Sequence, residues 1–130
     1  MPRTSRSTVV STLLLIAMSF VLSFVVAASP AGAAAHDGKW SVLVITEKGN
    51  CDRGYRYDVS VADGQVRYSG DGAVIFNGTV APNGAVKVAI RFGEQGANGV
   101  GRLSGNAGAG TWHGAGKGAE CSGRWEAERR

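Results

Sequence analysis

The sequence predicts an all-β protein, a small antiparallel meander of about eight strands that forms a closed or nearly closed barrel with one disulfide. Short segments alternate apolar and polar residues with a period of two, and no segment has helical periodicity. Units of glycine, any residue and a large apolar residue recur along the chain, and two cysteines follow an apolar leader. A two-sheet sandwich is the alternative arrangement of the same strands.

The apolar leader has the order of a secretory signal peptide. Arg3 and Arg6 give a basic start, residues 9–28 are apolar apart from serines and one threonine, and small residues follow. We assign residues 1–35 to this signal peptide. An uncleaved anchor is the alternative, since about 20 apolar residues can span a bilayer. The sequence therefore predicts one β-domain over residues 36–130, in the periplasm or secreted.

The charge of the chain argues against one class of partner. The formal net charge is +4, and Arg3 and Arg6 in the leader supply two of these four units. The remaining basic residues are scattered among acidic ones, so the chain lacks the electrostatic footprint of a nucleic-acid-binding protein. We expect no nucleic-acid partner, and no membrane association after the leader is removed.

Cys51 and Cys121 are the two cysteines, and in an exported chain such a pair predicts one disulfide. Cys51 follows the first predicted strand and Cys121 begins the last, so the bond would join the two ends of the sheet, as a closed barrel requires. A redox-active or metal-bound thiol pair is the alternative. The chain has no Cys-x-x-Cys motif and no histidine beside either cysteine, which disfavours that alternative.

The first half of the domain contains three predicted strands. Residues 39–46 are apolar on both faces, which is typical of a strand with both sides partly covered. Residues 55–61 show the cleanest alternation of apolar and polar side chains. Asp63 and Gly64 form a favoured hairpin turn, and the return strand follows at residues 66–68.

Two further strands are predicted over residues 74–80 and 86–92. Pro82, Asn83 and Gly84 lie between them and favour a tight turn. A loop over residues 93–98 then leads to the last part of the chain.

The last three predicted strands lie in glycine repeats at residues 99–105, 108–114 and 121–125, separated by connections at 106–107 and 115–119. Residues i and i+2 of a strand share a face. In each repeat, glycines therefore lie beside one large apolar residue on one face of the strand, and polar residues occupy the other face. The large apolar residues are Leu103, Trp112 and Trp125. The polar residues are Arg102, Thr111, His113 and Arg124. Small residues beside large ones suit a tightly curved barrel. Close approach of a ligand to the bare backbone is the alternative reason.

Six aromatic residues are candidates either to line a ligand cavity or to fill the core. They are Tyr55, Tyr57, Tyr68, Phe76, Trp112 and Trp125. We favour core filling, because so short a barrel has little interior room.

Few residues could carry chemistry. Beyond the leader there are two histidines, His36 and His113, and no Ser-His-Asp arrangement or phosphate-binding glycine loop can be placed. Nothing distinguishes Asp52 and Asp58 from solvated surface acids. We therefore expect no enzymatic activity and no cofactor.

The two histidines are also the candidates for a copper site. Cleavage after Ala33 would place His36 third in the mature chain, where its imidazole, two amides and the terminal amine suit square-planar Cu(II) or Ni(II). Cleavage after Ala35 would let the amine and imidazole of His36 combine with His113. An accidental histidine in a frayed terminus is the alternative that we favour.

Several motifs carry a resemblance. They are Gly38-x-Trp40, Lys48-Gly-x-Cys51-Asp52, Tyr57-x-Val59, Gly101-x-Leu103-Ser-Gly105, Gly110-x-Trp112 and Cys121-x-Gly123-x-Trp125-x-Ala127-x-Arg129. In these the chain resembles a group of small exported proteins of rhizobia-like alphaproteobacteria, which implies a compact β-domain and an envelope location but no activity. A weaker similarity, in Gly-x-Trp on the first strand and the eight-stranded meander, is to calycins such as lipocalins and avidins. No ligand residue is carried over from them.

These observations predict a non-catalytic binding or interaction module of the cell envelope, with an unknown protein or a small apolar molecule as its partner. One alternative is a small periplasmic copper-binding protein that uses the mature N-terminus. Another is an inhibitor of exported hydrolases that presents loops at residues 47–54 and 93–98.

Overall fold

The computed structural model describes residues 35–116 and 119–130, so all of the predicted signal peptide except Ala35 lies outside the described range. In the described residues the chain forms eight strands and no helix. The strands are β1 (Gly38–Lys48), β2 (Gly54–Ala62), β3 (Gln65–Tyr68), β4 (Val74–Val80), β5 (Ala85–Phe92), β6 (Gln95–Ser104), β7 (Ala107–Gly116) and β8 (Ala119–Arg129). None of the described residues belongs to a helix that is long and apolar enough to cross a membrane.

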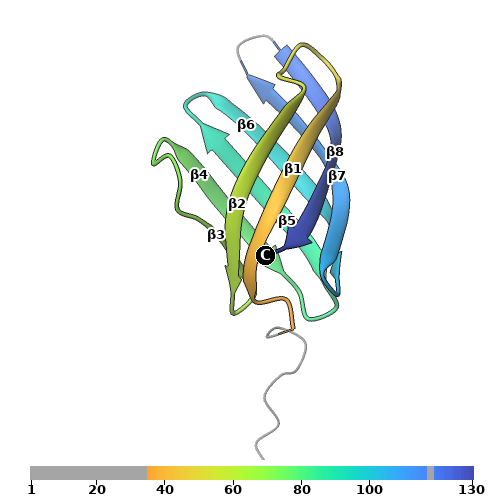
Figure 1. The fold of residues 1–130 in the computed structure, drawn as a ribbon. Coiled ribbons are helices and arrows are strands. Elements are labelled where there is room, and N and C mark those ends of the chain that lie inside the picture. The colour runs from red at the N-terminus through yellow and green to blue at the C-terminus, as the bar shows by residue number, and fades with distance from the viewer. Residues whose placement is uncertain (1–34, 117–118) are drawn as a thin grey trace, which may run out of the picture.

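The eight strands form one closed barrel (Figure 1). Each strand pairs antiparallel with the next, and β1 also pairs with β8, which closes the sheet. The predicted meander, its strand number and its closure are therefore confirmed, and the sandwich alternative is excluded.

Two predicted connections are shorter in the structure. The expected loop at 93–98 is reduced to a turn at Gly93 and Glu94, because residues 95–98 already pair with β5. The expected separation at 115–119 is also reduced, since β7 continues to Gly116 and β8 begins at Ala119. Main-chain hydrogen bonds do not require apolar alternation, so a polar, glycine-rich stretch extends a strand when a neighbouring edge needs partners.

The turn predicted at Asp63 and Gly64 has the backbone that a two-residue hairpin needs. Both residues have positive φ angles, 50° for Asp63 and 73° for Gly64. Positive φ at both central positions matches the twist of the two flanking strands.

The glycine repeats make room for a tryptophan. Trp125 points into the barrel, and its indole N–H donates a hydrogen bond of 3.2 Å to the carbonyl of Val100. The indole lies against Gly101 and Gly110, where an added Cβ would clash with the ring and with backbone carbonyls. At these two glycines, therefore, the repeats serve to pack small residues beside a large one.

One end of the barrel is closed by residues at both ends of the domain. The Arg129 guanidinium donates hydrogen bonds to the carbonyls of Asp37 (2.6 Å) and Ala35 (2.7 Å). It also lies over the Trp40 ring, 4.6 Å from the ring centroid. The Trp40 indole N–H in turn donates to the carbonyl of His36 at 3.0 Å. Residues 35–37 are thereby held across this end, and Trp40 is buried beneath them.

We expect Gly110→Ala to lower the free energy of unfolding by about 2 kcal/mol, because the added methyl overpacks the contact with Trp125 and the backbone of Val100. Urea denaturation measures this loss. Gly72→Ala is the matched control, since a Cβ at Gly72 meets no atom within 4 Å. Equal stability of the two variants would contradict this account of the repeats.

Arg129→Met keeps an apolar stem over Trp40 but removes the hydrogen bonds to the carbonyls of Ala35 and Asp37. We expect a loss of about 2 kcal/mol, since these hydrogen bonds have a charged donor. Arg130→Met serves as the control, because Arg130 is exposed and contributes its main-chain N–H instead. Thermal melts of both variants provide the comparison, and a similar shift in both would contradict the role given to Arg129.

Candidate functional site

The barrel encloses a cavity of about 610 Å³, to which all eight strands contribute lining residues. Pockets that hold drug-sized ligands have volumes of about 300–1,000 Å³. Most of the lining side chains are aliphatic, aromatic or absent, as at the glycines. The interior of the barrel is therefore the candidate site.

The cavity is closed at one end and open at the other. At the closed end it meets buried side chains, among them Trp40, Leu103 and Trp125. At the other end Tyr55 and Phe92 line the cavity while remaining 39% and 51% exposed. We call this open end the mouth; its lining residues are Asn50, Cys51, Asp52, Tyr55, Phe92, Gln95 and Gly116.

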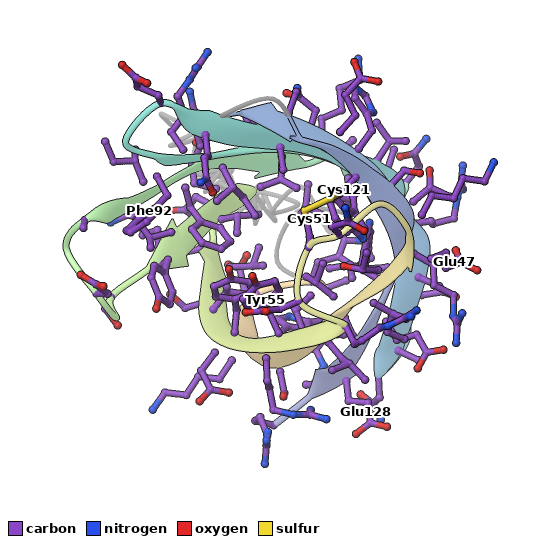
Figure 2. The ribbon with its side chains drawn as sticks, turned by 90° about the horizontal axis from the view of Figure 1, so that it is seen from above. Glu47, Cys51, Tyr55, Phe92, Cys121 and Glu128 are labelled. Carbon is purple, nitrogen blue, oxygen red and sulfur yellow. A yellow bond between two sulfur atoms is a disulfide. The ribbon has the colours of Figure 1, made fainter. Side chains whose placement is uncertain are left out.

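The view from above shows how the mouth is arranged (Figure 2). Tyr55 and the Cys51–Cys121 disulfide lie within the ring of strands, whereas Glu47 and Glu128 point away from it.

Five of the six candidate aromatic residues line the cavity, namely Tyr55, Tyr57, Phe76, Trp112 and Trp125. The sixth, Tyr68, packs against Tyr57 and Phe76, with ring centroids 5.6 and 4.8 Å away. Trp125 belongs to the buried core, and several of the others pack against that core. The structure thus combines the two roles that the sequence offered for this set, a core at the closed end and a cavity wall toward the mouth.

The cavity exists because opposite walls differ in side-chain size. The aromatic cluster, which we define as Tyr55, Tyr57, Tyr68 and Phe76, lies on β2, β3 and β4. Glycines line the wall formed by β6 and β7, at Gly96, Gly99, Gly114 and Gly116. Large residues on one side do not fill the space that the glycines leave on the other. This is the physical reason why the expectation of a filled interior is not met along the whole barrel.

The aromatic cluster also closes the barrel wall where backbone pairing is shortest. β3 has four residues and pairs with β4 through Gln65 with Thr79 and Val66 with Gly78. Beside this short pairing, Phe76 packs its ring 5.2 Å from Tyr57 and 4.8 Å from Tyr68, measured between centroids. Side-chain packing thus supplements the short ladder at this part of the wall.

The phenols at this wall stay neutral over a wider pH range than free tyrosine. Burial raises the pKa of Tyr57, and the neighbouring Tyr68 raises it further through charge repulsion. Burial also raises the pKa of Tyr55, to which Asp52 adds a hydrogen bond and its negative charge. A raised pKa favours the protonated phenol, so neither ring brings a charge to the cavity at neutral pH.

The predicted disulfide is present between Cys51 and Cys121, with their Cα atoms 6.1 Å apart. It links the connection at residues 49–53, which follows β1, to the beginning of β8. The main-chain N–H of Cys51 also donates a hydrogen bond of 3.2 Å to the Sγ of Cys121. The disulfide therefore fixes one side of the mouth and joins the two ends of the sheet, as expected. A disulfide is compatible with an extracellular or periplasmic protein.

The two histidines do not come together. His36 is buried at the closed end, where its Nε2 lies 3.3 Å from the carbonyl oxygen of Pro82. His113 is exposed on β7, opposite Asn98 and Ser122, near the disulfide end of the barrel. A copper site that combines both imidazoles is therefore not formed, and within the described residues no group of three or more His, Cys, Asp or Glu could hold a metal ion. The site that begins at Ala34 lies partly outside the described residues.

His36 also differs from the frayed terminus that the sequence favoured. Its carbonyl accepts the Trp40 indole N–H, and its ring is packed so that Nδ1 is buried without a partner among the described residues. Local sequence could not show this, because Pro82, which contacts the His36 ring, and Arg129, which binds the carbonyls of Ala35 and Asp37, are distant in the chain.

Sequence reasoning missed two features of the mouth. Asp52 was indistinguishable from a surface acid, yet it lines the cavity. For Phe92 the sequence predicts only a position in an alternating strand, whereas the structure places its exposed ring at the opening of the cavity. The one feature of the sequence that could have indicated the position of Asp52 is that it follows Cys51. A disulfide that closes the sheet also brings the neighbours of its cysteines to the mouth.

No protein-family model, curated protein or solved structure matches this chain.

Replacing both cysteines, as Cys51→Ser with Cys121→Ser, is expected to lower the free energy of unfolding by about 4 kcal/mol, because the cross-link closes a loop with a sequence separation of 70 residues. Chemical denaturation checks this value, and the unchanged protein with reductant should behave like the double variant. A loss below about 1 kcal/mol would show that the barrel closes equally well without the bond.

Proposed function

We propose that this protein is an exported, non-catalytic binding module that holds a small apolar molecule inside its barrel. The observation that carries this proposal is the cavity of about 610 Å³, lined mainly by apolar side chains and open at one end. Transfer of apolar ligand surface out of water into such a lining is favourable by about 25 cal/mol per Å².

The closed sheet supports the proposal because it lowers the cost of binding. Every strand is paired on both sides, and the disulfide holds the connection at residues 49–53 at the mouth. A cavity that exists before binding requires little ordering of side chains or loops when the ligand enters. Export is supported by the leader sequence and by the disulfide, which is typical of oxidising compartments.

The two alternatives have less support. An inhibitor that presents a loop at 93–98 loses most of that loop, since residues 95–98 belong to β6. A copper protein that uses His36 would have to release this residue from its buried position at the closed end.

The proposal is tested with an uncharged apolar fluorophore such as N-phenyl-1-naphthylamine. We expect saturable uptake and quenching of tryptophan emission, because Trp112 and Trp125 line the cavity. Val88→Phe adds a ring inside the barrel and should weaken binding about tenfold or more, which corresponds to about 1.4 kcal/mol.

Val100→Phe is the matched control, since Val100 is 54% exposed on the same barrel and does not line the cavity. It should bind the fluorophore like the unchanged protein, with melts confirming that both variants fold. Non-saturable uptake, or equal binding by the two variants, would contradict a ligand site in the barrel.

A further inference from the structure

The described lining of the cavity contains a negatively charged side chain and no positively charged one. Among the described residues that line it, Asp52 is the one side chain that is charged at neutral pH. The other polar groups are the amides of Asn50, Gln95 and Asn98 and the phenols of Tyr55 and Tyr57. No lysine, arginine or histidine of the described residues joins this lining.

Asp52 lies at the mouth in a segment that the barrel holds in place. The Thr46 hydroxyl donates a hydrogen bond of 2.6 Å to the Asp52 carbonyl, and the Thr46 N–H donates one of 3.0 Å to the carbonyl of Arg53. Cys51, the preceding residue, is fixed by the disulfide. The carboxylate is thereby carried on an anchored backbone beside the Tyr55 ring rather than on a free loop.

Among the described residues this carboxylate has a hydrogen bond with the Tyr55 phenol but no ion pair. The ion pairs found in residues 35–116 and 119–130 involve Arg124 with Glu47 and Glu126, and none includes Asp52. A second hollow of about 570 Å³ near the disulfide end contains charged residues of both signs, which are Lys48, Arg91, Glu94 and Glu120. The two cationic and two anionic side chains of this hollow balance in number, and Asp52 remains the one charged residue in the described lining of the barrel cavity.

The aromatic rings beside Asp52 add to the same preference. Tyr55 and Tyr57 are stacked, with an interplanar angle of 21° and centroids 6.3 Å apart. The face of a tyrosine ring attracts a cation through its quadrupole. The Asp52 carboxylate and the amide oxygens can accept hydrogen bonds from an ammonium group, which has three donors and no acceptor, and the ring faces attract its charge.

Resting on the proposed function, we propose that the ligand is an apolar amine that binds with its hydrocarbon or aromatic body in the barrel and its ammonium group at the mouth. The body would contact the valines of the lumen, among them Val59, Val66 and Val88. The ammonium group would lie against Asp52 and the rings of Tyr55 and Tyr57. An apolar carboxylate of the same length would bring its negative charge to the Asp52 carboxylate and bind more weakly.

The test compares dodecylamine, dodecanol and dodecanoate as competitors of the fluorophore, below their micelle concentrations. We expect the amine to bind about fivefold more tightly than the alcohol, and the carboxylate to bind more weakly than either. Asp52→Asn should reduce the preference of amine over alcohol to about twofold, the remainder coming from the tyrosine rings. High salt should weaken the preference in the unchanged protein.

Glu128→Gln is the matched control, because Glu128 points away from the barrel and its loss changes the net charge by the same amount (Figure 2). It should keep the full preference.

The outcomes separate this inference from the proposed function. If the three competitors bind equally, or if Asp52→Asn and Glu128→Gln behave alike, the amine assignment is overturned while the barrel remains a binding site. If the carboxylate binds most tightly, the assignment is also overturned. If neither the fluorophore nor any competitor binds, the proposed function itself fails.

Discussion

The antiparallel pairing of β1 with β8 is the interaction on which the rest of the structure depends. It satisfies the main-chain groups of the first and last strands, which would otherwise be exposed sheet edges. Both ends of this pairing are reinforced by side chains. The disulfide links the segment after β1 to β8 at the mouth, and Arg129 binds residues 35–37 over Trp40 at the other end.

A closed sheet of eight strands also fixes what the interior can be. Side chains on alternate residues all project into one lumen, so their total size decides whether that lumen is filled. Tryptophans and leucine fill it at the closed end, where Trp125 occupies the space left by Gly101 and Gly110. Toward the mouth, glycines of β6 and β7 face the aromatic cluster, and the volume between them remains open. A single barrel thus has a packed base and a hollow upper part.

Much of the fold followed from local patterns. Period-two alternation and turn residues such as Asp63 and Gly64 located the strands and hairpins, because these depend on neighbouring residues in the chain. The strand bounds near Gly93 and Gly116 did not follow, since those residues pair according to what the adjacent strand offers. The roles of His36 and Asp52 were also missed, because their surroundings come from distant segments.

The sequence by itself determined the all-β meander, its eight strands and the disulfide, since strand period, turn chemistry and the number of cysteines are local or countable properties. Only the tertiary structure decided that the interior is partly hollow and that the hollow opens beside Asp52. Volume and charge inside a barrel depend on which side chains face each other across it. That relation is set by the register of all eight strands together, and no single segment contains it.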